Sequence, residues 1–342
     1  MGNEGTRTHH SALITHHSMH GSVLLYVVWA VLLLSVFATS VASQVVAAIN
    51  LSDRLADQLQ SSYITHAAVS FLTRALAADR TQAVDGLHEM WSDNPAVFST
   101  HELAGGTFTV MHRAPDSDEP RYGMVDEDGK LSLNAAPAAV LAGLMEAVGG
   151  LREQEAQEVA VAIEDWRDTD DVERPDGAES IYYRSLRDGY DCKNGPLENV
   201  EELLLIRGVT PDVYERVRPY VTVYGSGRLN LNTASTPVLQ ALGLSAEGIE
   251  GFTQYRAGED NTEGTDDDRL LTSVGAFASD LNTFMPTKDI GRISALAAQN
   301  VFGVKSTAFR AEISATLPKS ASAVHALCVI DRDGRVRLWS ER

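Results

Sequence analysis

No Asp, Glu, Lys or Arg occurs anywhere between Thr8 and Ser52, and this charge-free run constrains the chain more than any other feature. Between Val23 and Phe37, Ser35 is the only frankly polar residue. A helix of about 20 apolar residues is long enough to cross the hydrocarbon core of a bilayer. The run is therefore long enough to hold the rest of the chain at a membrane.

The run can be interpreted either as a signal peptide that is cleaved off or as a membrane helix that is retained. A secretory signal peptide has an apolar core of about 7–15 residues followed by a small-residue cleavage site, and Val41-Ala42-Ser43 fits such a site. Against this, no Pro or Gly interrupts residues 22–85, and apolar residues continue at helical spacing, at Val45, Ile49, Ala56, Leu59, Tyr63 and Ala67. The pattern predicts one helix over residues 22–78, roughly 85 Å long at 1.5 Å per residue, that leaves the membrane as a stalk.

The start of this helix resembles the amino terminus of type IV pilin-like proteins, which have a short polar leader, a Gly before the cleavage point and an unbroken apolar helix. The resemblance implies a leader over residues 1–21, cut between Gly21 and Ser22. Two features depart from the pattern. Most pilins carry Glu at the fifth mature position, where this chain has Tyr26. The leader is also rich in histidine, whereas the leaders of most pilins are rich in Lys and Arg. Histidines can bind metal, but a leader that is removed needs no metal site.

Charge and cysteine content narrow the functional classes. The chain has 342 residues, enough for two modest domains, and a net charge of -19. Residues 126–290 hold 32 Asp or Glu against 14 Lys or Arg, a balance of -18. This field repels phosphate backbones and predicts that nucleic acid is not a partner. Cys192 and Cys328 are too few for a metal cluster, so they form either one bridge or two free buried thiols.

The acidic middle segment contains an internal repeat. GKLSLNAAPAAVL at 129–141 and GRLNLNTASTPVL at 227–239 share seven of thirteen positions. Each reads as a short strand, an Asn that can cap, and the start of an Ala-rich helix. An apolar helical stretch and a carboxylate-rich loop follow each copy. The sequence therefore predicts a duplicated helical unit.

A helix, a tight turn at Gly208 and a second helix are predicted between the two copies. Such helix-hairpin-helix units commonly bind DNA through the amides of the turn and nearby basic side chains. Arg207, Arg216 and Arg218 are near the turn, but five carboxylates surround them, Glu198, Glu201, Glu202, Asp212 and Glu215. A compact packing unit is the favoured interpretation, and a membrane-anchored periplasmic DNA-binding module is the alternative.

Four phrases in order, DWRDTDDVERPDGAESIYY, NGPLENVEELLLIRGVT, YERVRPYVTVYG and RLNLNTAS, resemble the type II secretion minor pseudopilin K family. The resemblance runs from Gly21 to the end of the chain. That family typically lacks the Glu that Tyr26 replaces. It implies an α+β fold with a pilin-like long N-terminal helix, an antiparallel sheet and a large inserted helical domain of the helix-hairpin-helix or SAM-like kind.

The implied domains are a prepilin leader (1–21), a membrane-spanning and stalk helix (22–78), a pilin-like α/β domain (79–125 plus 300–342) and the inserted helical domain (126–299). The strands of the pilin-like domain are expected in GTFTVMHR before the insert, and in FRAEISATL and HALCVIDRDGRVRLW after it. The last phrase carries a hairpin signal, with residues 331–334 as the turn.

The resemblance also implies a role and partners. The chain is expected to be a single-pass protein of a bacterial inner membrane with its C-terminal domain in the periplasm. There it would cap the tip of the pseudopilus and help to initiate its assembly. The implied partners are the minor pseudopilins I and J, the prepilin peptidase and the inner-membrane assembly platform. A calcium-dependent adhesin that uses the same tip position is a further alternative.

Carboxylates form the only polar constellation that suggests chemistry. The first group comprises Asp165, Asp168, Asp170, Asp171 and Glu179, and the second comprises Asp260, Asn261, Asp266, Asp267 and Asp268. Oxygen ligands at this density repel one another unless a cation joins them, and calcium accepts six to eight oxygens in flexible geometry. The spacing is not that of an EF-hand, and a solvated acidic loop is the alternative. The family resemblance favours calcium as the cofactor.

No catalytic motif accompanies these carboxylates. The sequence has no Gly-rich phosphate loop, no G-x-S-x-G elbow and no H-E-x-x-H zinc pair. Asp165 and Asp168 have no other catalytic group near them in the sequence. We therefore expect that the protein is not an enzyme.

Overall fold

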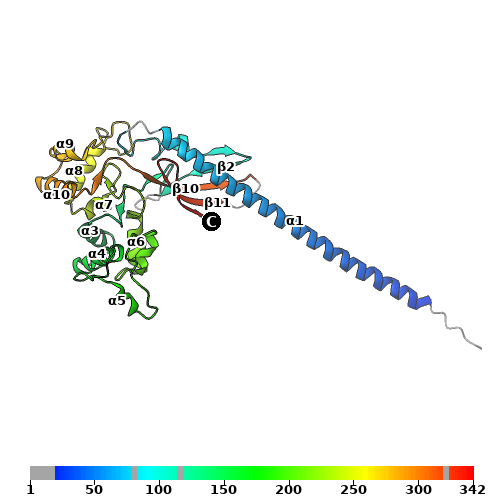
Figure 1. Cartoon of the computed structure of the whole chain (residues 1–342). Coiled ribbons are helices and arrows are strands. Elements are labelled where there is room, and N and C mark those ends of the chain that lie inside the picture. Colours follow the sequence, from blue (N-terminus) through cyan, green and yellow to red (C-terminus); the bar gives the residue numbers. More distant parts are fainter. Residues whose placement is uncertain (1–19, 79–82, 114–118, 319–322) are drawn as a thin grey trace, which may run out of the picture. The chain divides into compact units, whose positions relative to one another are not determined.

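The computed structural model describes residues 20–78, 83–113, 119–318 and 323–342. Contacts divide the chain into two compact units, Met1–Asp57 and Gln58–Arg342. Helix α1 (His20–Ala78) begins in the first unit and ends in the second, and every other described element belongs to the second unit (Figure 1). The long helix that the sequence predicts is confirmed.

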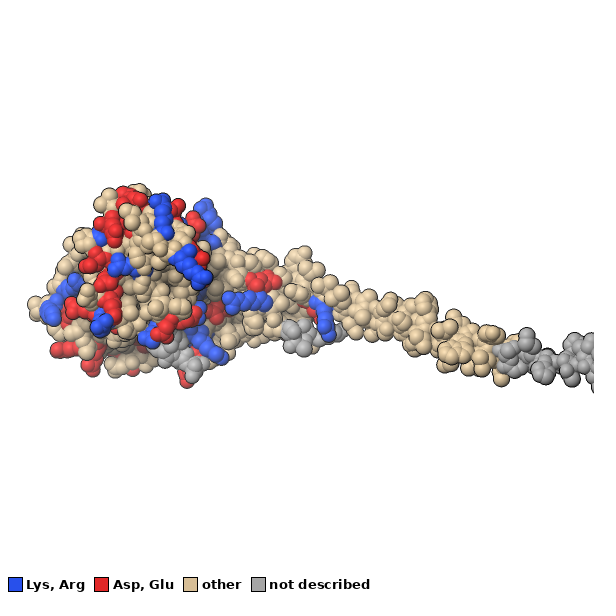
Figure 2. All heavy atoms as spheres, turned by 90° about the horizontal axis from the view of Figure 1, so that it is seen from below, with Lys and Arg blue, Asp and Glu red and all other residues tan. Residues whose placement is uncertain are grey.

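The first unit holds the apolar part of α1, whose side chains from Val23 onward are exposed. By length and composition it can cross a membrane, with a mean hydropathy of 2.3 in its most apolar window. Its few hydroxyl groups bond within the helix: Ser35 Oγ donates to the Val31 carbonyl at 2.8 Å and Thr39 Oγ1 to the Ser35 carbonyl at 3.0 Å. Such bonds give the hydroxyl groups a hydrogen-bond partner, which the hydrocarbon of a bilayer does not offer. Figure 2 shows no acidic or basic side chain on the described part of the helix nearest its start.

A six-stranded antiparallel sheet forms the pilin-like part of the second unit. Five strands follow the order β1-β2-β10-β11-β12, and β5 pairs with β10 at the end that β2 leaves free. Their bounds are β1 (His101–Leu103), β2 (Gly106–Val110), β5 (Val125–Asp126), β10 (Ala308–Thr316), β11 (Val324–Asp331) and β12 (Val336–Glu341). The expected strands before and after the insert are confirmed, as is the hairpin turn, where the Gly334 amide bonds the Asp331 carbonyl at 2.8 Å.

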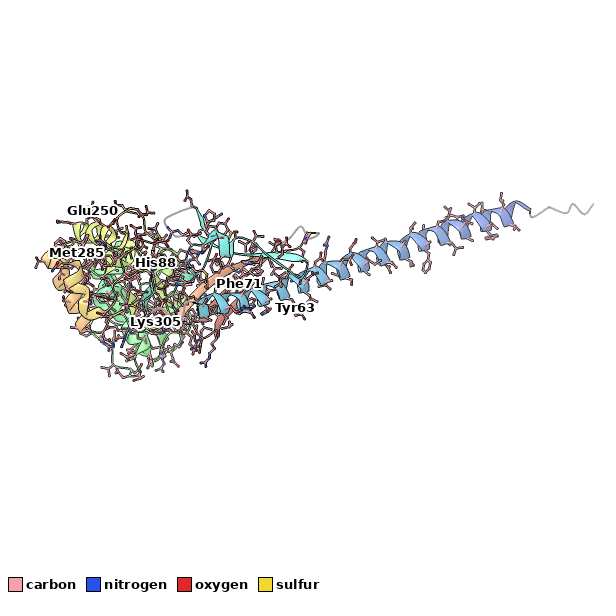
Figure 3. The ribbon with its side chains drawn as sticks, turned by 90° about the horizontal axis from the view of Figure 1, so that it is seen from above. Tyr63, Phe71, His88, Glu250, Met285 and Lys305 are labelled. Atoms are coloured by element: carbon pink, nitrogen blue, oxygen red, sulfur yellow. The ribbon has the colours of Figure 1, made fainter. Side chains whose placement is uncertain are left out.

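The last five turns of α1 pack on this sheet. Ile64, Ala68, Leu72 and Leu76 recur every four residues, so they share one face of the helix, and all are buried. Full burial of a leucine side chain contributes about 2 kcal/mol, so this face holds the helix to the sheet strongly. Phe71, marked in Figure 3, lies beside this face with its ring centroid 5.7 Å from that of Phe108.

The insert between β5 and β10 is helical and has its own buried core. Its helices are α3 (Ala138–Ala147), α4 (Glu153–Arg167), α5 (Ser180–Arg184), η1 (Val200–Leu205), α6 (Pro211–Val217), η2 (Arg218–Tyr220), α7 (Thr236–Ala241), α8 (Ala246–Arg256), η3 (Val274–Ala276), α9 (Phe277–Leu281) and α10 (Thr287–Ala298). Outside the insert lie α2 (Pro95–Phe98) and the strand pair β3 (His112–Arg113) and β4 (Pro120–Arg121). The domain boundaries at single-residue precision stay a prediction.

The sequence repeat is also a structural repeat. Each copy contains one short parallel strand pair, β6 (Leu131–Ser132) with β7 (Val221–Thr222), and β8 (Leu229–Asn230) with β9 (Phe302–Gly303). In each copy an arginine at the end of the second helix closes the turn before the first helix. Arg167 donates to the Leu133 and Ala136 carbonyls, and Arg256 donates to the equivalent carbonyls of Leu231 and Ala234.

The asparagine of each copy has a role that the sequence reasoning missed. The expected helix caps are wrong, because Pro137 precedes α3 and Ser235 precedes α7 at the cap positions. Asn134 instead donates to the Leu197 carbonyl at 2.9 Å and accepts from the Leu197 amide at 2.8 Å. Asn232 makes the same two bonds to Leu271, at 3.1 and 2.8 Å. Each Asn side chain thus makes with one leucine backbone the pair of hydrogen bonds that a residue of a neighbouring β-strand would make.

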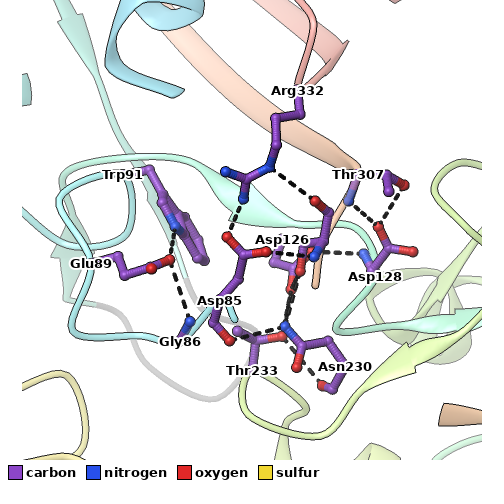
Figure 4. Close-up of polar contacts among 11 residues, drawn as sticks. Asp85, Gly86, Glu89, Trp91, Asp126, Asp128, Asn230, Thr233, Thr307 and Arg332 are labelled. Carbon is purple, nitrogen blue, oxygen red and sulfur yellow. Dashed lines mark hydrogen bonds and ion pairs between the residues drawn. The ribbon is translucent and has the colours of Figure 1, made fainter. Parts of the chain in front are cut away.

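Buried aspartates join the sheet to the insert (Figure 4). Asp126, at the end of β5, is 5% exposed. Its Oδ1 accepts from the Asp128 amide at 2.8 Å, and its Oδ2 accepts from the hydroxyls of Thr233 and Ser306 at 2.5 and 2.6 Å. Asn230 of the second repeat donates to the same oxygen at 3.4 Å.

Two further carboxylates extend this junction. Asp128 accepts from the Ser226 amide at 2.6 Å through Oδ1 and from the Thr307 amide at 2.6 Å through Oδ2. Asp85, which is fully buried, forms an ion pair with Arg332 in the β11–β12 turn. The junction therefore ties the segment after α1, both ends of the insert and the last hairpin into one hydrogen-bonded network.

Asp126 should make stability depend on pH. Burial, and then the neighbouring Asp128, raise the pKa of Asp126 from its ordinary value of 3.8 to about 7. The folded state therefore holds more protons than the unfolded state between these values, so stability falls as pH rises from about 4 to 7. We expect Asp126→Asn to remove a part of this loss, on the order of 1–3 kcal/mol, in denaturation of the detergent-solubilised chain in chelator at pH 5 and pH 8. The exposed Asp333→Asn is the control, and equal pH slopes for both variants and the wild type would contradict the assignment.

Candidate metal centre

The first acidic loop (residues 165–179) begins in the last turn of α4 with a buried aspartate. Asp165 Oδ2 accepts from the Ala178 amide at 2.9 Å and from the Arg174 amide at 3.3 Å, and Oδ1 accepts from Arg174 Nη1 at 2.6 Å. The loop returns so closely that a Cβ on Gly177 would lie 1.9 Å from Asp165 Oδ2. Glycine at that position is therefore required for the loop to fold over this carboxylate.

Arg174 provides a positive charge inside the loop. Its Nη1 bridges Asp165 and Asp168, and these hydrogen bonds raise the pKa of the guanidinium. Asp168 also accepts from the Asp170 amide at 3.2 Å. Arg174 is not among the ligands expected from the sequence, although a basic residue between Glu173 and Asp176 is a signal for it. The bridge partly neutralises the two carboxylates.

Glu179 is the residue of the loop whose surroundings most suggest a bound cation. It is 1% exposed, and within the described chain neither of its carboxylate oxygens has a hydrogen-bond partner. Burial raises its pKa to about 7, with further contributions from Asp165 and Asp168. The Cys192 thiol lies close enough to act on this pKa, but its hydrogen bond goes to the Asp165 carbonyl at 3.7 Å. An unpartnered buried carboxylate is costly, which points to a missing positive partner.

Three of the five expected ligands of the first loop come together. One oxygen each from Asp165, Asp168 and Glu179 lie within 4.8 Å of one another. Asp170 is exposed and bonds the Val172 amide, so it stands apart from this group.

Asp171 is exposed and accepts from the Ser180 amide at 3.4 Å. The Ser180 hydroxyl, and then this amide, lower the pKa of Asp171. Asn194 also acts on Asp171, and its Oδ1 is buried without a hydrogen-bond partner among the described residues. Sequence spacing could not predict the contact of Asn194 with Asp171, because Asn194 lies outside the acidic loop in the sequence.

The second acidic loop (residues 259–268) uses its carboxylates to hold its own backbone. Asp267 Oδ1 accepts from the Thr265 hydroxyl at 2.7 Å, and its Oδ2 accepts from the amides of Glu259 and Asp260 at 2.6 and 3.1 Å. The hydroxyl, and then the two amides, lower the pKa of Asp267 to about 2. Asp260 Oδ1 accepts from the Thr262 amide at 2.7 Å, and Asp268 Oδ2 from the Gly264 amide at 2.8 Å.

The remaining expected ligands of this loop are exposed or lack a hydrogen-bond partner for one oxygen among the described residues. Asp266 and Asn261 are exposed, while Asp268 Oδ1 is buried without a partner in the described chain. Among the described residues this loop forms no carboxylate group as close as that of the first. A cation at the second loop stays a prediction.

The three arginines near the Gly208 turn are engaged within the protein. Arg207 pairs with Glu158 at 3.4 Å, Arg216 pairs with Asp212, and Arg218 pairs with Glu215 at 2.9 Å. The first helix of the expected helix-hairpin-helix is a single 3-10 segment, η1. The DNA-binding alternative is not supported, because the basic groups that it needs already face carboxylates.

The expected cleavage point lies at the beginning of α1. Gly21 and Ser22 are in its first turn, while residues 1–19 of the expected leader lie outside the described residues. Tyr26 is 71% exposed on the helix surface. The two cysteines are free and buried, so they form no bridge in this structure.

Comparison with known proteins agrees with the fold and the insert. The family model for "Type II secretion system (T2SS), protein K" matches residues 122–226. Type II secretion system protein K of Klebsiella pneumoniae is 24% identical over 64% of this chain and 66% of its own length. The putative protein K of Escherichia coli K12 is 32% identical over 31% of this chain and 32% of its own. The matches thus span less than two thirds of these relatives.

A solved structure extends the likeness to most of the chain. It is the crystal structure of the GspK-GspI-GspJ complex from the type 2 secretion system of enterotoxigenic Escherichia coli, with a TM-score of 0.62 and 16% identity. The similarity covers 85% of this chain and 99% of that one, so the two share a fold. Together with the family model and the relatives, this shows that the chain is similar to type II secretion system protein K over part of its length and shares the fold of the solved structure.

Proposed function

We propose that this protein is a minor pseudopilin that caps the tip of the periplasmic pseudopilus of a type II secretion system and helps to initiate its assembly. One observation carries the proposal. A single chain combines a membrane-length helix that continues into a pilin-like sheet with a helical insert matched by the protein K family model. This role is structural and needs no catalytic residue.

Tyr26 supports the tip position. In pilins a carboxylate at the fifth mature position is thought to neutralise the amino terminus of the neighbouring subunit above. Tyr26 carries no charge there, so this subunit is poorly suited to dock beneath another one. The insert between β5 and β10 adds a second bulky domain to the sheet and would obstruct further subunits. Both features suit the end of a filament.

The partners follow from the same proposal. The similar solved chain lies in a complex named for GspK, GspI and GspJ, so we propose the I and J minor pseudopilins as direct partners. The prepilin peptidase would process the leader, and the inner-membrane assembly platform would receive the mature chain. The helix would anchor the protein in the inner membrane, with the second unit in the periplasm.

The mature amino terminus tests the pilin-type processing. Sequencing of the protein extracted from membranes should give Ser22, because cleavage after Gly21 leaves the apolar helix in place. Gly21→Leu should leave the precursor uncut, since a large side chain replaces the smallest one at the cleavage point. Recovery of a soluble protein that begins near Gln44 would show that an ordinary signal peptidase acts, and the pilin-type processing would be rejected.

Replacement of Tyr26 tests the tip position. Tyr26→Glu should leave secretion unchanged or reduce it, because a carboxylate in the bilayer costs a few kcal/mol unless it finds a partner. Secreted enzyme activity in a strain that lacks the wild-type gene is the measurement, with Tyr26→Phe as the control for loss of the hydroxyl. A clear gain in secretion with glutamate would contradict the tip assignment.

We also propose that the first acidic loop binds calcium. Asp165, Asp168 and Glu179 would hold the ion, and the buried Asn194 carbonyl oxygen is available as a further ligand. The donor set fits, since it consists of hard oxygens, and calcium tolerates irregular geometry. The bound ion would supply the positive charge that the unpartnered Glu179 carboxylate lacks. Arg174 would compete with calcium for the oxygens of Asp165 and Asp168.

Thermal melts test the calcium site. The detergent-solubilised chain should melt several degrees higher in millimolar calcium than in chelator, because a ligand at a hundredfold excess over its Kd stabilises by about 2.7 kcal/mol. Magnesium should do less, because it prefers strict octahedral geometry and retains its waters. Glu179→Gln should remove most of the shift, and the exposed neighbour Glu173→Gln should keep it.

Two further variants sharpen this test. Asp168→Ala should also reduce the calcium shift, whereas Asp266→Ala in the second loop should reduce it less. Arg174→Gln should lower stability in chelator, since Asp165 loses its counter-charge, and should enlarge the gain on adding calcium. Equal melting temperatures in calcium and in chelator for the wild type would reject calcium binding and leave the tip assignment untouched.

A further inference from the structure

A cavity of about 200 Å³ opens on the seam between the sheet and the insert. On the sheet side, Arg113 of β3, Arg121 of β4 and Arg310 of β10 line it. Its apolar lining includes Trp91 and Met124, each 1% exposed. Three strands that are separate in the sequence thus place guanidinium groups around one small, partly apolar space.

The insert lines the opposite side with polar groups that are already satisfied. Arg256 pairs with Glu263, with Nη2 to Oε1 at 2.5 Å, and both residues line the cavity. Lys130 pairs with Glu127. The carboxylate of Asp126, the other acid of the lining, accepts the hydrogen bonds of the junction. The acidic groups of the cavity are therefore committed elsewhere and do not neutralise the three sheet-side arginines.

Arg310 has two carboxylates within ion-pair distance, but neither accepts a hydrogen bond from it. The nearest carboxylates, those of Glu127 and Glu312, lie 3.9 and 3.7 Å from its nitrogens, beyond hydrogen-bond distance. Its Nε is buried and donates no hydrogen bond within the described chain. Over the same described ranges, Arg113 and Arg121 form no ion pair within 4 Å. A buried guanidinium N–H without an acceptor is costly, so an anionic acceptor would stabilise this site.

His112 lies in the wall of the cavity beside two of these arginines. Burial above all, with smaller contributions from the charges of Arg310 and Arg121, lowers the pKa of His112 to about 4, against the hydrogen bond with the Gly123 carbonyl and the charge of Asp93. The ring therefore lies among positive charges and stays neutral. The chain as a whole has a net charge of -19, so a cavity lined by several cationic side chains is unexpected.

We propose that this cavity binds a carboxylate carried on a short aliphatic stem. Arg310 and Arg121 would bind the carboxylate through charge-assisted hydrogen bonds. The stem would contact Trp91 and Met124. A space of this size admits one side chain or a molecule of that size, and is smaller than the pockets that take drug-sized ligands. Two sources have this chemistry, an acidic side chain of a polypeptide and a free small dicarboxylate.

Binding should be measured on the full chain in detergent micelles by NMR of the histidine ring, with His112→Gln to assign the signal. Three probes are compared at equal concentration: glutarate, the blocked peptide acetyl-Gly-Glu-Gly-amide and inorganic phosphate. Glutarate, the peptide or both should raise the pKa of His112 by about one unit, because a bound anion offsets the guanidinium charges. Phosphate should act more weakly, because it has no carbon stem to contact the apolar wall.

The two carboxylate probes separate the two sources. Equal or tighter binding of the peptide assigns the site to a chain-borne carboxylate, and binding of glutarate alone assigns it to a free small molecule. Phosphate binding as tight as that of the carboxylates would overturn the proposal, since the apolar wall would then contribute nothing. An unchanged His112 pKa with all three probes would also overturn it.

Variants locate the site. Arg310→Gln should weaken binding of the stronger carboxylate probe by about tenfold or more, the size expected for one lost charged hydrogen bond. Arg121→Gln, at an exposed position that should not affect folding, should weaken it several-fold. Arg335→Gln removes the same charge from the exposed β11–β12 turn outside the cavity and should leave binding unchanged. Wild-type affinity in both cavity variants, or equal losses in all three, would overturn the assignment.

Discussion

The short pairing of β5 with β10 is the constraint on which the rest of the second unit depends. Val125 faces Arg310 and Asp126 faces Phe309, so the chain leaves the sheet and returns to it at the same place. Holding the two ends of an inserted domain together costs loop-closure entropy, which contacts at those ends must offset. The buried aspartates of the junction hold them, because Asp128 bonds both Ser226 inside the insert and Thr307 at its exit. The sheet can therefore close as if the insert were absent.

The two repeats use the same devices for folding and differ where function is proposed. Asn134 and Asn232 each bond the backbone of one leucine through the side-chain amide. Arg167 and Arg256 donate to equivalent carbonyls of the turn before the first helix of their copy. The acidic loops that follow have diverged. In the second loop Asp267 accepts hydrogen bonds from backbone amides, whereas in the first loop the buried Glu179 carboxylate has no hydrogen-bond partner in the part of the chain that the structure describes. Duplication thus explains the scaffold, and the loops carry what is specific to each copy.

Much of the fold could be predicted because it rests on local patterns. A run without charge or helix-breaking residues predicts the apolar part of α1, and the family resemblance predicts β2, β10 and β11 on either side of the insert. The role of Asn134 could not be predicted, since its partner Leu197 lies 63 residues away and only packing of the insert brings them together. The same limit applies to the arginine-lined cavity, whose walls come from separate strands.

Arg174 also decides how the candidate metal centre relates to folding. In small zinc domains the ligands repel one another without metal, so binding and folding are one event. Here the guanidinium already bridges Asp165 and Asp168, and main-chain amides bond the buried Asp165 carboxylate. The loop can therefore fold before any cation arrives, with Glu179 as the remaining unsatisfied group. A cation at this position would adjust the stability of a preformed loop, and its binding would depend on the balance between Glu179, which favours it, and Arg174, which competes with it.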